Sequence, residues 1–440
     1  MARAIRAGTE KGGAVRYLLL LFLTTIGINW PALPFNARIA DLIFIPLAIA
    51  AIALGVPRLT WRRADLAVAV YLLGAVPAVL ISPEPRQSAV EFVREIYLAS
   101  IYVVFAIVAA RGLATTIGLG LALGGAFLSI SGLLFVALQW LGATAWPMMG
   151  EVMQLPYVGS TLRLRALTAS EAMLACVLTA AVPFAVTACS SHRVRAWCQH
   201  AAVMTVAATL TFSHAIAGFA VAVVIALWPA LAARPVWRRA AVGGALVDAL
   251  ALNFAATASV RSVRYGDSSY ADTSQYHHAV DQRQLRIGGA AITYDVMSYA
   301  RIKQVAWQAF LEHPVAGLGL DRFHSASRRA FEEGRLPAQY REIDPHSTVL
   351  GRLAECGIIG GVTLLLLWIA WAGLAREVSG SPVGLAAAAA LAGLIVSSLN
   401  ADIMNFRFLW VIAGLLRGLQ EANGMVTASG RAVAAADGTR

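Results

Sequence analysis

The sequence is poor in charge. Only 13% of its 440 residues are charged, whereas 59% are hydrophobic. A soluble domain usually carries about 25% charged residues, because its surface must be covered by polar groups. The composition therefore argues against a soluble protein. The net charge of +11 does not indicate nucleic-acid binding, since much of the excess lies in short connections between apolar runs, where it sets membrane orientation.

Cysteine is also scarce, and the cysteines lack the spacing of metal ligands or of a disulfide framework. They are Cys176, Cys189, Cys198 and Cys356. The Gly317-Leu318-Gly319 turn is not a phosphate loop, because no Lys-Ser/Thr follows it. The His277-His278 pair has no clear ligand partners. We expect no metal and no cofactor.

Long apolar runs recur along the chain, and each is long enough to cross about 30 Å of hydrocarbon. Runs in lipid must satisfy their backbone internally, so they are expected to be helices. The sequence predicts an all-α polytopic membrane protein with about twelve spans. These lie near 15–33, 38–56, 64–82, 93–110, 113–142, 167–190, 197–213, 215–233, 238–258, 348–374, 382–401 and 403–420.

The basic residues predict the orientation of these spans, because cytoplasmic loops carry an excess of Lys and Arg. Alternate connections contain Arg58, Arg62, Arg63, Arg111, Arg193, Arg195, Arg234, Arg238, Arg239 and Arg376. This bias places both termini in the cytoplasm. The predicted organisation is nine spans in 1–258, an outside loop domain at 259–346, three spans in 347–420 and a disordered cytoplasmic tail at 421–440.

The loop at 259–346 is too long and too mixed in charge for a simple linker, and such loops are usually functional. Apolar residues recur at helical spacing over Tyr299–His313, and a second helix is expected over Phe323–Gly334. Between these two helices, Val315–Leu320 is predicted to form a turn that contains glycine.

Ionisable residues gather at the predicted outer membrane edge, where they are candidates for function. Arginine forks match phosphate oxygens and keep their charge, so several of them suit an anionic lipid phosphate or diphosphate. They could equally lie in headgroups or in salt bridges. The candidates are Arg163, Arg165, His214, Arg301, His313, Asp344, His346, Asp402 and Arg407.

His346 is the sharpest candidate. It stands in Asp344-Pro345-His346-Ser347 just before a span, and Pro345 can start a helix, so His346 is expected in the first helical turn. The positive end of a helix lowers the pKa of an imidazole. A neutral imidazole accepts a proton from an attacking hydroxyl near neutral pH. The alternative is an interface histidine that only forms hydrogen bonds.

The stretch from Arg301 to Gly361 resembles the O-antigen ligase and polymerase superfamily. The matching features are an Arg and a Trp opening a helix, His-Pro, a Gly-x-Gly turn, and then His-Ser, Leu, Glu and Gly-x-x-Gly at the start of a span. In this chain they are Arg301, Trp307, His313-Pro314, Gly317, Gly319, His346-Ser347, Leu350, Glu355, Gly357 and Gly360. Two looser matches lie upstream. Arg163-Leu164-Arg165 precedes Ala169-Ser170-Glu171 instead of Asn-Pro, and His214 stands where the family has arginine.

The resemblance implies a GT-C-like membrane glycosyltransferase without metal or cofactor. The donor would be a glycan on undecaprenyl diphosphate and the acceptor lipid A-core, among membrane lipids at the periplasmic face of the bacterial inner membrane. His346 would activate the acceptor hydroxyl, and Arg301, Arg163, Arg165 and His214 would bind the diphosphate, with His313 and Asp344 in support.

Three functions remain open at this point: a ligase that transfers finished glycan to lipid A-core, a polymerase that transfers it to another carrier-linked unit, and a transporter. A transporter should carry ionisable residues and broken helices near mid-membrane, often in repeated halves. In this chain, Asp248 is nearly the only ionisable residue expected near mid-membrane. The single long outer loop favours the ligase over the polymerase.

Overall fold

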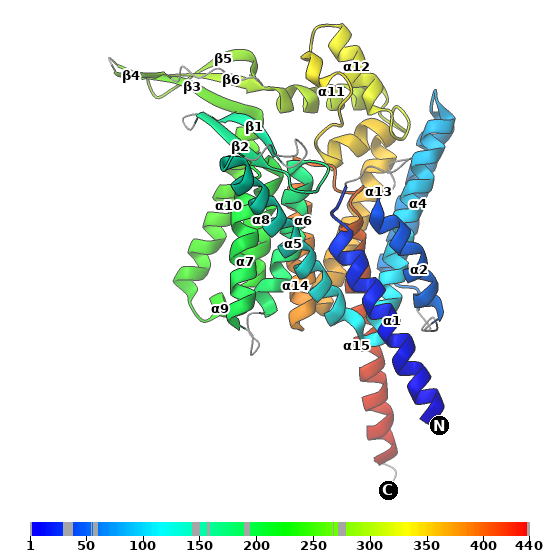
Figure 1. Ribbon diagram of the computed structural model, residues 1–440. Coiled ribbons are helices and arrows are strands. Elements are labelled where there is room, and N and C mark those ends of the chain that lie inside the picture. The colour runs from blue at the N-terminus through cyan, green and yellow to red at the C-terminus, as the bar shows by residue number, and fades with distance from the viewer. Residues whose placement is uncertain are drawn as a thin grey trace.

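The computed structural model describes residues 2–29, 38–53, 55, 60–142, 150–155, 159–188, 194–266, 268–271 and 279–437. Cys189 and the His277-His278 pair lie outside these residues. Figure 1 shows a bundle of helices with both termini at one end and the segment containing α11 and α12 at the other. The predicted arrangement of two termini on one side and the long loop on the opposite side agrees with this layout.

Each of the twelve predicted spans overlaps a helix or a pair of helices. The bundle consists of α1 (Ala2–Thr25), α2 (Ile39–Ala53), α3 (Arg63–Ile81), α4 (Pro85–Val108), the π-helical turn η2 (Ala109–Leu113), α5 (Ala114–Trp140), α6 (Glu171–Ala188), α7 (Val194–Thr209), the 3-10 turn η3 (His214–Ile216), α8 (Ala217–Ala226), α9 (Trp228–Ala232), α10 (Pro235–Thr257), α13 (Thr348–Val378), α14 (Pro382–Ser397) and α15 (Arg407–Asp437).

Five helical stretches of the described chain are long and apolar enough to cross a membrane. They are Arg63–Ile81, Pro85–Gln139, Glu171–Ala188, Pro235–Thr257 and Thr348–Val378. Large apolar side chains point outward from the bundle, including Leu73, Leu80 and Val247, each about two-thirds exposed or more. Such a surface suits lipid rather than water. The chain is a mostly helical, polytopic membrane protein, and the number of twelve crossings stays a prediction.

Small residues let the helices approach closely, as is common in membranes. A Cβ on Gly414 of α15 would lie 2.4 Å from the Tyr102 carbonyl oxygen of α4, and one on Gly218 of α8 would lie 1.8 Å from the Gly393 carbonyl oxygen of α14. Trp371 and Trp410 are fully buried and meet edge to face at 5.5 Å. These contacts pack the helices closely against one another beneath the outer end of the bundle.

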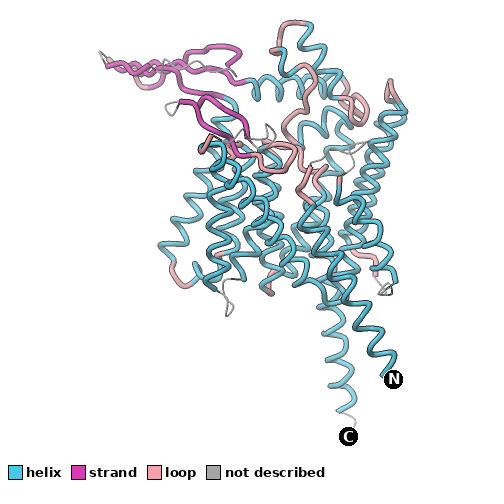
Figure 2. The backbone as a smooth tube through the Cα atoms, in the orientation of Figure 1, coloured by secondary structure: helices cyan, strands magenta, loops and turns pink. Residues whose placement is uncertain are grey.

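The prediction of an all-α protein is incomplete, because the outer segments contain strands. β1 (Gly150–Leu155) and β2 (Gly159–Leu164) form a hairpin, and β3 (Ala258–Tyr265), β4 (Ser268–Ala271), β5 (Ala279–Ile287) and β6 (Ala290–Met297) form an antiparallel sheet in the order β4-β3-β6-β5. Figure 2 shows this sheet as an arm extending sideways from the helices. Gly288 and Gly289 turn the β5–β6 hairpin with φ of 55° and 82°, as a tight hairpin requires.

The two helices predicted in the long loop are confirmed as α11 (Ser298–Glu312) and α12 (Phe323–Glu332), followed by the short turn η4 (Ala338–Tyr340). Ile302, Val305, Ala306 and Ala309 of α11 are buried in one cluster with Phe323 of α12. The helical spacing of these residues therefore predicted the correct face.

The described part of the predicted tail, residues 421–437, differs from the prediction. It continues α15 to Asp437 instead of being disordered. The physical reason is its alanine content, since Ala432, Ala434, Ala435 and Ala436 favour helix more strongly than any other residue type.

Candidate functional site

A cavity of about 870 Å³ lies at the outer end of the bundle, where the long loop meets α2, α4, α6 and α13. Its charged lining residues come from segments far apart in the sequence. The cations are Arg38, Arg94, His324, His346, Arg352 and Arg407, and the carboxylates are Asp41, Glu91, Glu95, Asp321, Asp344, Glu355 and Asp402. A cavity of this size that is lined by charged side chains is a candidate active site.

His346 lines this cavity, but it is not in the first turn of a helix. α13 begins at Thr348 after the cap residue Ser347, and His346 lies before it with a left-handed φ of 47°. The Asp344 carboxylate holds this turn, because its Oδ1 accepts the His346 backbone N–H at 2.9 Å, as in an Asx turn. Strained non-glycine residues of this kind cluster at functional sites.

Asp344 also orients the ring of His346. The Nδ1 atom lies 2.5 Å from Asp344 Oδ1, so a neutral ring that donates from Nδ1 keeps its lone pair on Nε2. Burial raises the pKa of Asp344, but the hydrogen bond from His346 and its charge outweigh this and hold that pKa below its usual value. Asp344 is therefore ionised at neutral pH and can stabilise a protonated imidazole.

A second side of the histidine ring is covered by Tyr299, in the first turn of α11. The two rings stack with centroids 4.7 Å apart and planes 25° apart. The same tyrosine ring meets His214 edge to face at 5.4 Å. Tyr299 thus connects the histidines of two bundle segments, His214 at η3 and His346 before α13.

The glycines of the motif bind the long loop to α13 by backbone contacts. The Leu318 N–H donates to the Ala354 carbonyl at 2.9 Å, and the Ile358 N–H donates to the Pro314 carbonyl at 2.8 Å. A Cβ on Gly317 would lie 2.2 Å from the Glu355 backbone, and one on Gly357 would lie 2.3 Å from the Val315 backbone. Only glycine permits this approach, which fixes α11 and α12 beside the cavity.

The predicted arginines separate into two groups. Arg163 lies near Tyr299, on which its charge acts. Its Nε donates to the Thr211 carbonyl at 3.3 Å. Arg165 donates to the Thr168 carbonyl. Arg301 forms an ion pair with Asp281 of β5 at 3.1 Å. None of the three is among the residues that line the cavity.

His313 lies at the far end of α11 from Tyr299. Its backbone N–H closes the helix on the Ala309 carbonyl at 3.1 Å, and its own carbonyl accepts the Gly317 N–H at 3.0 Å. It shapes the turn before the glycines, and it is not among the cavity-lining residues.

Three cavity arginines were not singled out from the sequence: Arg38, Arg94 and Arg352. Arg407, a candidate from the sequence, also lines the cavity. Arg407 is neutralised by a bidentate contact with Asp41, and Arg94 by Glu91 at 3.2 Å. The Arg38 guanidinium has Met173 Sδ as its hydrogen-bond partner at 3.4 Å. At this end of the cavity three arginines, Arg38, Arg94 and Arg407, face two carboxylates, Asp41 and Glu91, so the local charge is positive by one.

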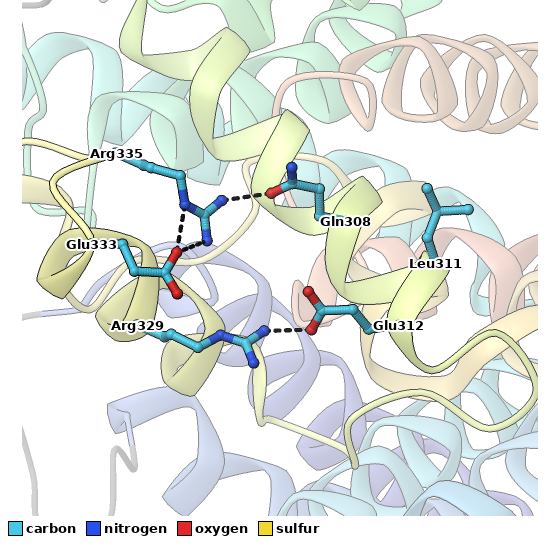
Figure 3. A pocket seen from close by; sticks show the side chains of 6 residues that line it. All are labelled: Gln308, Leu311, Glu312, Arg329, Glu333 and Arg335. Atoms are coloured by element: carbon cyan, nitrogen blue, oxygen red, sulfur yellow. Dashed lines mark hydrogen bonds and ion pairs between the residues drawn. The ribbon is translucent and has the colours of Figure 1, made fainter.

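A separate outer groove lies between α11 and α12, and its charges are already paired. Arg329 contacts Glu312, and Arg335 contacts Glu333 and Gln308, each at about 2.5 Å (Figure 3). We interpret these paired charges as contacts that hold the segments of α11 and α12 together, and we do not interpret the groove as a binding site. Within the described part of the chain, no group of three His, Cys, Asp or Glu side chains could hold a metal ion.

Comparison with known families identifies the long loop and its flanking helices. A family model described as O-antigen ligase matches residues 200–365. This match spans less than half of the chain, and the matched part is similar to the O-antigen ligase family. The O-antigen ligase match runs from α7 into α13, so it includes His214, Tyr299 and His346, whereas Arg38, Arg163 and Arg407 lie outside it. No curated protein matches the chain.

The family match confirms the resemblance carried by Arg301–Gly361. The matched family consists of membrane enzymes of the ligase and polymerase type, which act on lipid-linked glycans. The match does not extend to the choice between the two reactions.

Proposed function

We propose that the protein is an O-antigen ligase that transfers glycan from undecaprenyl diphosphate to lipid A-core at the periplasmic face of the inner membrane. The observation that carries this proposal is the oriented His346, held by Asp344 and Tyr299 at the wall of a cavity lined by charged side chains. Its position agrees with the location expected for a reaction between two lipid-anchored molecules.

In this reaction His346 Nε2 accepts the proton of the acceptor hydroxyl while that oxygen attacks the anomeric carbon of the donor. The bond from the anomeric carbon to the diphosphate oxygen breaks, which inverts the configuration. The undecaprenyl diphosphate leaves with the bonding electrons, and Asp344 stabilises the imidazolium. The diphosphate is a good leaving group when cations neutralise it, so no general acid is needed.

For the diphosphate we propose the end of the cavity around Arg38, whose guanidinium contacts Met173 Sδ, while the neighbouring Arg94 and Arg407 are paired with Glu91 and Asp41. Preorganised cations stabilise charge that develops on a leaving group. Arg163 acts on Tyr299 but lies 3.8 Å from the Glu171 carboxylate, so we assign it no contact with the diphosphate. Arg301, which the resemblance assigns to the diphosphate, is committed to Asp281, so we assign it to holding α11 against the sheet.

The proposal is tested by profiling lipopolysaccharide from a cell that lacks the protein, beside the complemented strain. A ligase predicts loss of the long ladder from lipid A-core and accumulation of polymerised glycan on the carrier. A core that carries a single repeat unit identifies a polymerase instead. An unchanged ladder contradicts both and favours a transporter or a ligase for another glycan.

A further inference from the structure

A second hollow, which we call the side notch, lies beneath α11 and has a volume of about 490 Å³. It is bounded by Thr257 at the end of α10, Leu350 in the first turn of α13, and Lys303, Gln304 and Trp307 of α11. Most of the surface that faces the side notch is apolar, and the one cation among the lining residues is Lys303.

Lys303 has no carboxylate within ion-pairing distance among the described residues. Its ammonium donates to Asn400 Oδ1 at 2.8 Å, and burial lowers its pKa to about 8. A partly buried charge without an opposite charge is unfavourable. Other outer cations near α11 have such partners, for example Arg301 with Asp281 and Arg335 with Glu333. The side notch therefore has room for an anion beside Lys303.

Asn400 separates the side notch from the catalytic cavity. It accepts from Lys303 on one side, and it is itself a lining residue of the cavity that contains His346. The Asn400 side chain is fixed by donating to Asn253 Oδ1 at 3.0 Å. A molecule held at Lys303 thus lies against the other side of the wall of the catalytic cavity.

The side notch also lies at the expected membrane surface. Thr257 ends a helix long enough to span the bilayer. Trp307, Leu311 and Val315 follow one another along the same segment and are 47%, 58% and 63% exposed. Tryptophan with neighbouring apolar side chains is typical of the interface between lipid and water. A lipid can reach the side notch from the outer leaflet without crossing water.

We propose that the side notch binds the lipid-anchored acceptor, with a phosphate ester of its glycolipid headgroup on Lys303 and apolar chain along Trp307 and Leu350. This inference rests on the proposed transfer between two lipid-anchored substrates. Two such substrates need separate places in the membrane plane, and the arginines around Arg38 provide the one for the donor diphosphate.

The test uses the purified full-length protein in proteoliposomes, with transfer measured while donor and acceptor are varied separately. Lys303→Met is expected to raise the KM for a phosphorylated acceptor about tenfold, the loss typical of one hydrogen bond to a charged group. The kcat and the donor KM should stay within about twofold. Lys303→Arg should restore the acceptor KM, and Arg335→Met, a paired outer cation, serves as the matched control.

A second arm uses an acceptor whose phosphates have been removed enzymatically. The wild-type protein should then show the raised acceptor KM, and Lys303→Met should add nothing further. An unchanged acceptor KM in Lys303→Met, a raised donor KM in its place, or an equal effect with the dephosphorylated acceptor would each overturn the inference. A wild-type protein with no transfer at all would contradict the proposed function itself, so the two failures are distinguishable.

Discussion

At the scale of single residues, His346 is held from two directions. Asp344 contacts Nδ1 and the backbone N–H, while Tyr299 covers the ring face. The sequence predicted that His346 stands just before a span, and His346 does precede α13. It could not reveal Tyr299 as a partner, because stacking depends on how α11 docks. The left-handed turn at His346 was also hidden, since Pro345 suggested a helix start.

Tyr299 is predicted to be a positioning residue that acts through its ring. Tyr299→Phe should keep at least half of the transfer rate. Tyr299→Leu should lower kcat about tenfold with both KM values unchanged, because an aromatic pair contributes about 1 kcal/mol or slightly more. Steady-state kinetics in proteoliposomes measures this, with the exposed Tyr265→Leu as control. Equal losses in the Phe and Leu variants would assign the effect to the hydroxyl group instead.

The donor site is predicted at Arg38 rather than at Arg301. Arg38→Gln should raise the donor KM at least tenfold, because it removes a cavity guanidinium whose hydrogen-bond partner is the Met173 sulfur rather than a carboxylate among the described residues. Arg301→Gln should change the donor KM by less than about threefold, since Arg301 is paired with Asp281. The reverse result would restore the assignment that the family resemblance suggests.

At the scale of elements, the helical spacing over Tyr299–His313 correctly predicted α11, and the sheet was missed although its signals are present. Gly288-Gly289 separates two runs rich in alternating apolar residues, the usual mark of a hairpin. The convergence of Arg38, Arg94 and Arg407 had no such local signal, because these residues come from α4 and from the starts of α2 and α15. Charge patterns along a sequence cannot reveal which helix ends meet.

The backbone contact between Gly357 and the loop is predicted to hold α11 and α12 at the cavity. Gly357→Ala should lower the free energy of unfolding by about 2 kcal/mol or more, because φ is 61° and the added Cβ would lie 2.3 Å from the Val315 backbone. Transfer should fall as well. Thermal unfolding in detergent measures the first effect and the proteoliposome assay the second.

The matched control lies on the same helix. Gly373 has open space around its position, so Gly373→Ala should leave stability unchanged or raise it slightly, as expected for alanine in a helix. Equal behaviour of the two variants would mean that the contact between the loop and α13 does not hold the site together.

At the scale of the whole molecule, the apolar runs and the basic connections predicted the layout well. Both termini lie at the end opposite α11 and α12 (Figure 1), and the catalytic cavity lies where the outer loop closes over the bundle. The polar chemistry is therefore gathered at one end of the molecule, while the rest of the bundle presents apolar side chains outward.

The central claim is most directly tested by the rate of glycan transfer from an undecaprenyl-diphosphate donor to lipid A-core in proteoliposomes that contain the His346→Ala variant. General-base catalysis contributes about 10²–10⁴-fold, so the rate should fall at least a hundredfold while donor binding persists. His200→Ala, which changes a half-buried histidine of α7, should retain the wild-type rate. Transfer by a folded His346→Ala variant at the wild-type rate would contradict the role of His346 and the mechanism built on it.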